Sequence, residues 1–219
     1  MDAEPSPADR QLLLLLHGLG QTPQTWQDQV TSLPTGWSAA APWLRGLKPT
    51  DDVAFTVADA SGWLGTDLIR NGVPSAHLCG HGLGAMVALQ FAVDQPEQVR
   101  RLVLVAGQVQ PPRAVQWLQK RMLRRVSATR LAQQGLNRER MLQAMQAMAD
   151  TDVSHRLAEV AAPTLVVCGE RDRANLPASR LLAAQIPSAE LVLVPGAGHQ
   201  PHVEAPEAFN RSVFGFLTS

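Results

Sequence analysis

The sequence has no tyrosine, only two cysteines, and no excess of either charge. Its 19 basic and 19 acidic side chains cancel at pH 7, so no overall field favours nucleic acid or an anionic membrane as a partner. Cys79 and Cys168 each end an apolar run, as buried reduced thiols do, and they do not form a disulfide framework. No cysteine or histidine pattern typical of a metal site is present, so we expect no metal and no cofactor.

Long hydrophobic runs are also missing. The leucine run Leu12–Leu16 stops at His17-Gly18, and an acidic rather than a basic segment precedes it. It is too short to cross a bilayer, and it lacks the basic start of a signal peptide. We therefore expect neither a signal peptide nor a membrane span, and a cytoplasmic protein.

What the sequence does contain is the pattern of a globular α/β domain. Hydrophobic residues make up 45% of the 219 residues, a globular value, and the length suits one domain. Short apolar runs alternate with helical patterns, which indicates βαβ units and a parallel sheet. The strands that we expect are Leu12–Leu16, Trp37–Ala41, Ala76–Cys79, Arg101–Val105, Thr164–Cys168 and Leu191–Val194.

A helical insertion follows the fourth expected strand. Residues 108–162 hold nine basic and four acidic side chains, a shift in composition that marks a segment with its own surface. We predict a core of residues 1–107 and 163–219 and a helical cap of residues 108–162. The basic residues of this cap form either a solvated helix face or a lid over an anionic substrate.

Candidate functional residues follow four of the expected strands. In open parallel sheets, ligands bind beyond the carboxyl ends of the strands. We therefore expect two glycine-rich turns, one acid and one histidine to meet at that edge of the sheet. The four segments are His17-Gly18-Leu19-Gly20, Gly80-His81-Gly82-Leu83-Gly84, Gly169-Glu170-Arg171-Asp172 and Gly196-Ala197-Gly198-His199.

These four segments, in this order, resemble the α/β-hydrolase superfamily over nearly the whole chain, and small esterase and enol-lactonase-like members in particular. The family's Gly-x-Ser-x-Gly nucleophile elbow matches Gly80–Gly84. The resemblance implies a triad acid at Asp172, a base at His199, and an oxyanion hole from the backbone N–H groups of Leu19 and Leu83. It also implies a mainly parallel sheet of about six strands, helices on both faces, a small helical cap, and hydrolysis of esters or lactones.

The sequence departs from the family at one decisive position, since Gly82 stands where the nucleophile is expected. Glycine has no side chain, so no acyl-enzyme can form there. Deliberate replacement of a serine and natural loss both fit. Three functions stay open: a hydrolase whose serine is replaced, a non-hydrolytic enzyme of the cofactor-free oxygenase, lyase or cyclase type, or a non-catalytic ligand-binding pseudo-hydrolase. The second would use the His199–Asp172 dyad and the oxyanion hole for general-base catalysis.

Other interpretations of the same residues are weaker. Gly80, Gly82 and Ala85 also fit a dinucleotide-binding fingerprint, but the next strand does not end in the acid that this fingerprint requires. We expect His81 to be packed into the sheet rather than to act as a nucleophile. We expect His202 at the start of a surface helix rather than as the base.

For the substrate pocket we expect Trp43, Arg45, Trp117 and Met122, with Arg45 either binding a carboxylate or bracing its loop. The other methionines of the insertion line an adaptable apolar pocket or form an ordinary helical core. The expected partner is a small molecule, an apolar ester, lactone or acid. We expect no nucleic acid and no membrane as partner, and the sequence is compatible with a homo-oligomer.

Overall fold

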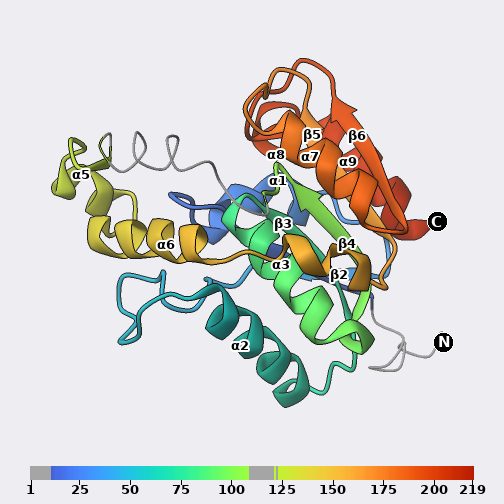
Figure 1. Cartoon of the computed structure of the whole chain (residues 1–219), viewed down its shortest axis with the longest axis horizontal. Helices are drawn as coiled ribbons and strands as arrows, with labels where there is room; N and C mark the ends of the chain where they lie inside the picture. The colour runs from blue at the N-terminus through green and yellow to red at the C-terminus, as the bar shows by residue number, and fades with distance from the viewer. Residues whose placement is uncertain (1–10, 109–120, 122) are drawn as a thin grey trace.

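The computed structural model describes residues 11–108, 121 and 123–219. Its sheet has six strands in the order β2-β1-β3-β4-β5-β6, all of them parallel (Figure 1). The strands are β1 (Gln11–Leu16), β2 (Trp37–Ala40), β3 (Ala76–His81), β4 (Val99–Val105), β5 (Thr164–Gly169) and β6 (Ala189–Val194).

Helices connect the strands. Within the described residues, no helix combines the length and apolar character needed to cross a bilayer. The α-helices are α1 (Gln27–Thr31), α2 (Val57–Arg70), α3 (Leu83–Asp94), α5 (Ala128–Gln133), α6 (Arg138–Asp150), α7 (Leu176–Gln185), α8 (Pro201–Glu204) and α9 (Pro206–Thr218), and the 3-10 helices are η2 (Pro23–Trp26), η3 (Pro96–Gln98) and η4 (Ser154–Glu159).

The leucine run shows why the sheet is covered on both faces. Side chains alternate along a strand, so neighbouring leucines point to opposite faces. Leu14 and Leu16 belong to a core cluster that includes residues of α2, α3 and α7. Leu13 and Leu15 belong to a second cluster with Trp26 and the apolar face of α9. The expected parallel sheet with helices on both faces is confirmed.

Strand β3 is longer than the sequence predicts. It continues through Gly80 and His81, because these residues pair with Leu104 and Val105 of β4. A side chain at Gly80 would collide with the next helix, since its Cβ would lie 2.3 Å from the carbonyl oxygen of Gly84. Gly80 therefore belongs to β3, and the turn is confined to Gly82.

Helices α5, α6 and η4 follow β4 in the chain and precede β5. Figure 1 shows α5 and α6 at one side of the molecule, away from β5 and β6. These helices supply the helical structure expected for the described part of residues 108–162. Leu123, Leu131 and Met145 form a small apolar cluster there, and Leu19 of the loop after β1 packs against it. The division of the chain into a core and a cap stays a prediction.

Arg140 of α6 ties this helical segment to the loop that follows β2. Its guanidinium donates to the carbonyl oxygens of Gly46 and Val53 at 3.0 and 2.8 Å, and also to the carbonyl oxygen of Asp51. The Asp51 carboxylate shapes the same loop by accepting from the backbone N–H groups of Gly46 and Lys48 at 2.7 and 3.1 Å. The guanidinium of arginine carries five N–H donors in a planar fork, so it can serve three carbonyl groups at once.

We expect Arg140→Met to lower the free energy of unfolding by about 1–3 kcal/mol, because three carbonyl groups lose a charged donor. The melting temperature should fall by several degrees, and amide exchange should speed up in residues 46–53. The matched control is Arg130→Met, since Arg130 is exposed on α5. Equal effects of the two substitutions would contradict this role of Arg140.

Candidate active site

The turn between β3 and α3 consists of Gly82. Its backbone has φ 53° and ψ −108°, a conformation that residues with a side chain rarely adopt. Gly84 allows α3 to begin against β1, because a Cβ there would lie 2.2 Å from the carbonyl oxygen of Leu16. The chain therefore turns sharply from strand to helix, as the expected elbow requires.

A cavity of about 460 Å³ lies beside this turn, and Gly82 forms part of its wall. Its polar wall includes Gln108, Asp172, Asn175 and His199. No serine, threonine or cysteine is among the described residues that line it. The leucines and methionines of its apolar wall are Leu19, Leu83, Leu123, Met141, Met145 and Met148.

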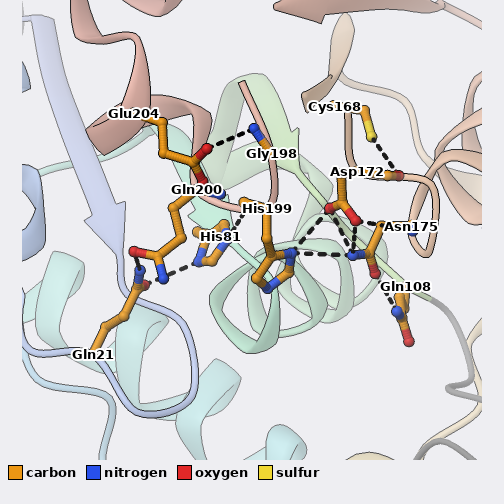
Figure 2. Close-up of polar contacts among 10 residues, drawn as sticks. All are labelled: Gln21, His81, Gln108, Cys168, Asp172, Asn175, Gly198, His199, Gln200 and Glu204. Atoms are coloured by element: carbon orange, nitrogen blue, oxygen red, sulfur yellow. Dashed lines mark hydrogen bonds and ion pairs between the residues drawn. The ribbon is translucent and has the colours of Figure 1, made fainter. Parts of the chain in front are cut away.

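His199 and Asp172 form the hydrogen-bonded pair expected from the sequence (Figure 2). The Nδ1 atom of His199 lies 3.0 Å from Oδ2 of Asp172. The Asp172 side chain is 5% exposed, whereas that of His199 is 52% exposed. A carboxylate can only accept, so Nδ1 carries the proton, and Nε2 of the neutral ring holds a free lone pair. The ring is therefore arranged to accept a proton.

Asn175 holds the carboxylate in place. Its Nδ2 atom lies 2.8 and 2.7 Å from the two carboxylate oxygens of Asp172, and 3.0 Å from Nδ1 of His199. Gln108 in turn donates to Oδ1 of Asn175 (Figure 2). Burial by itself would raise the pKa of Asp172, but the hydrogen bonds from His199 and Asn175 outweigh burial and hold this pKa below its ordinary value. Asp172 is therefore an anion with a fixed orientation.

The sequence did not predict this role of Asn175. Asn175 occupies the N-cap position of α7. The Asn175 side chain makes no capping hydrogen bond and binds the carboxylate instead. The available signal was a polar residue directly before Leu176-Pro177 and three residues after Asp172. This signal predicted only the start of a helix.

His81 is packed into the sheet, as expected. Its Nδ1 lies 3.0 Å from Oε1 of Gln21, and its Nε2 lies 2.9 Å from the carbonyl oxygen of His199 (Figure 2). Gln21 also accepts from the backbone N–H of Gly18 at 2.7 Å, so His81 links the loop after β1 to the loop of His199. Burial, helped by the nearby His199, lowers the pKa of His81 to about 4. The neutral ring donates to one of its two acceptors at a time.

The expectation of a surface position for His202 is wrong. Helix α8 does begin there, but His202 is fully buried. Its ring stacks on Trp26 with centroids 4.3 Å apart, and its Nε2 lies 3.1 Å from Oγ1 of Thr25. Burial lowers the pKa of His202 to about 2. A buried imidazole that resists protonation is a poor general base, so His199 remains the candidate.

Two backbone contacts fix the loop that carries His199. The Glu204 carboxylate accepts from the backbone N–H groups of Gly198 and Gln200 at 2.7 and 2.9 Å, on either side of the histidine (Figure 2). Gly169 at the end of β5 allows the loop to approach, since a Cβ there would lie 2.0 Å from the carbonyl oxygen of Gly198. The position of the histidine therefore depends on contacts of the main chain.

Leu19 and Leu83 both line the cavity. Within the described part of the chain, neither backbone N–H has a hydrogen-bond partner. Leu83 is the first residue of α3, where N–H groups have no partner within the helix and the helix dipole favours negative charge. Both groups are therefore free to bind an anionic oxygen.

The residues expected in the substrate pocket are not all brought to this cavity. Trp43 and Arg45 line a separate hollow of about 300 Å³, together with Trp63. Trp117 and Met122 lie outside the described residues. The apolar side of the cavity is instead supplied by leucines and by the methionines of α6.

A parallel sheet with a sharp glycine turn and a histidine–carboxylate pair at its strand ends defines the α/β-hydrolase class. The model of the Alpha/beta hydrolase family matches residues 13–212, and the chain belongs to this family.

Relatives of the chain carry hydrolase names. It is 29% identical to the "Putative carbamate hydrolase RutD" of Variovorax paradoxus, over 96% of this chain and 93% of that protein. A hydrolase from Pseudomonas aeruginosa has a similar structure, with a TM-score of 0.85 and 25% identity over 97% of this chain and 91% of that one. The enol-lactonase of Burkholderia xenovorans shares the fold with a TM-score of 0.86, at 19% identity over 96% and 92% of the two chains.

The buried histidines make stability depend on pH. Burial lowers the pKa of His17, His77 and His81 to about 4, and that of His202 to about 2. The unfolded chain takes up these protons near pH 6.5, whereas the folded chain resists them, so stability should fall as the pH drops from about 6.5 towards 4. Urea unfolding midpoints measured between pH 8 and 4.5 test this.

His202→Gln should reduce the slope of the free energy of unfolding against pH by up to about 1.4 kcal/mol per pH unit, because one fewer proton is taken up on unfolding. The matched control is His155→Gln, because His155 is exposed. The same slope in His202→Gln and in the unmodified chain would contradict a neutral buried His202.

Proposed function

We propose that this chain acts on a small carboxylic ester, lactone or carbamate, and that Gly82 occupies the position of the family's nucleophile. The observation that carries the proposal is the His199–Asp172 pair, with its 3.0 Å hydrogen bond, in the wall of a cavity that Gly82 also lines. The names of its relatives, which include a carbamate hydrolase and an enol-lactonase, support this class of substrate.

His199 is the general base in this proposal. Its half-exposed ring stands in the cavity wall, and its Nε2 lone pair is free to take a proton from a reacting group. Asp172 selects the tautomer and stabilises the imidazolium that forms, as the carboxylate of a catalytic triad does. Asn175 keeps Asp172 ionised and oriented, so the charge needed at that stage is present beforehand.

The backbone N–H groups of Leu19 and Leu83 form the oxyanion hole. The oxygen of a substrate carbonyl becomes negative during attack, and donors that already point at its position stabilise that charge without reorganisation. Leu83 adds the positive end of α3, a helix of 12 residues. These groups are main-chain atoms, so they serve the chemistry whatever side chain stands at Gly82.

The substrate has an apolar body in this proposal. Leucines and the methionines of α6 line one part of the cavity, and methionine adapts its shape to different ligands. A cavity of about 460 Å³ is of the size that holds a small organic molecule. The partner in this proposal is therefore a small molecule.

A second candidate is proton abstraction without hydrolysis. It is favoured by the absence of serine, threonine and cysteine from the described residues of the cavity wall. His199 would remove a proton next to a carbonyl, and the same oxyanion hole would hold the enolate oxygen. Release of an acid from an ester or lactone separates the two candidates, since only hydrolysis yields it.

The activity should rise with pH, because only the neutral ring of His199 can accept a proton. His199→Ala should reduce the rate of ester hydrolysis by roughly 100-fold or more, and Asp172→Asn should lower it severely by reversing the tautomer. Initial rates with 4-nitrophenyl butyrate between pH 5 and 9 measure this. Equal rates in His199→Ala and the unmodified chain would rule out the proposed function.

The chain should not react covalently with fluorophosphonate or sulfonyl fluoride probes, because Gly82 offers no nucleophile. Intact mass spectrometry after incubation with excess probe measures this. Gly82→Ser, treated in parallel, is the positive control. Stoichiometric labelling of the unmodified chain would show that another side chain is the nucleophile.

A further inference from the structure

We propose that the space beside Gly82 holds the attacking water, so that this site cleaves its substrate in a single displacement without an acyl-enzyme. The inference rests on the proposed function, and it names the nucleophile that the proposed function leaves open. It also explains how a site without a nucleophilic side chain can still hydrolyse an ester.

The three glycines of the turn differ in what surrounds them. A Cβ at Gly80 or Gly84 would lie 2.3 or 2.2 Å from backbone atoms, so close packing requires both glycines. A Cβ at Gly82 would meet no atom of the described residues within 4 Å, its two chain neighbours aside. Packing therefore does not require glycine at this position, and Gly82 lines the cavity.

The cavity that Gly82 lines, of about 460 Å³, is large enough for water and has polar side chains in its wall. A water molecule takes about 30 Å³ and needs two or more polar partners. The imidazole of His199 supplies an acceptor at Nε2, and the substrate carbonyl carbon would lie on the cavity side. Because the Asp172 carboxylate holds the ring by a 3.0 Å hydrogen bond, its Nε2 stays directed away from that carboxylate.

The chemical step balances without any further reactant. The water oxygen bonds to the carbonyl carbon while its proton moves to Nε2 of His199, and the carbonyl electron pair moves to an oxygen held by the N–H groups of Leu19 and Leu83. The tetrahedral intermediate then re-forms the carbonyl as the bond to the leaving oxygen breaks. His199 returns its proton to that oxygen, so one ester and one water give one acid and one alcohol.

The other nucleophilic groups near the cavity are already engaged. His81 lines the cavity, but both of its ring nitrogens face hydrogen-bond partners, Gln21 and the carbonyl of His199. Both carboxylate oxygens of Asp172 are held by Asn175. Among the described residues, this leaves water at Gly82 as the nucleophile that His199 can activate.

The decisive test compares acceptors on the unmodified chain. Phenyl, 3-nitrophenyl and 4-nitrophenyl butyrates are hydrolysed in the presence of methanol, and the ratio of methyl butyrate to butyric acid is measured. A common acyl-enzyme would give one ratio for all three esters. In a single displacement the leaving group is still attached when the acceptor attacks, so we expect the ratio to change with the leaving group and no burst of phenol.

Two substitutions with the same backbone strain locate the water. Gly82→Ala places a methyl group in the space and should slow histidine-dependent hydrolysis by roughly 100-fold, because misplacement of a reacting group by about 1 Å has effects of that size. Gly82→Ser should give a burst of one phenol per chain, since its hydroxyl replaces the water as nucleophile. Melting temperatures of the two variants control for strain.

The outcomes separate the two proposals. Hydrolysis that depends on His199 but gives a constant product ratio, or is equally fast in Gly82→Ala, would overturn the water at Gly82 and leave the proposed function standing. Hydrolysis no faster than in His199→Ala would overturn both. The product ratio needs no variant, so the inference stays testable if Gly82→Ala does not fold.

Discussion

The close contact between the start of α3 and the end of β1 is the constraint on which the rest of the site depends. It exists only because Gly84 has no side chain to separate the helix from the carbonyl oxygen of Leu16. It brings the loop of Leu19 and the first N–H of α3, that of Leu83, to one cavity. Gly82, directly before α3, has a positive φ, a conformation that glycine adopts without strain.

His199 is anchored to this frame from two sides. Its carbonyl oxygen lies 2.9 Å from the ring of His81 in β3, and its imidazole is held by Asp172. Asn175 donates to Asp172, and Gln108 donates to Asn175 (Figure 2). Both residues line the cavity. A histidine held in this way needs little reorganisation when charge develops beside it. No side chain at the turn between β3 and α3 takes part in these contacts.

The sequence by itself determined the strands, their parallel class and the order of the candidate residues. These are local properties: an apolar run of about five residues between turns predicts a buried strand wherever it later packs. Parallel strands place their carboxyl ends at one edge, so the residues that follow them were expected together, and Asp172 and His199 do lie 3.0 Å apart. Gly82 was likewise predicted at a strand–helix turn, because the alternating glycines Gly80, Gly82 and Gly84 stand in the sequence itself.

Tertiary structure decided what depends on contacts between distant segments. His202 resembles a surface residue in sequence, and only the packing of α8 against Trp26 buries it. The side chain of Asn175 donates to Asp172 instead of capping α7. Trp43 lines a separate hollow rather than the cavity. The strand end at His81 was set by its partner in β4. Sequence patterns report local preference and order, whereas burial and pairing at these positions are set by residues far away in the chain, which no local pattern contains.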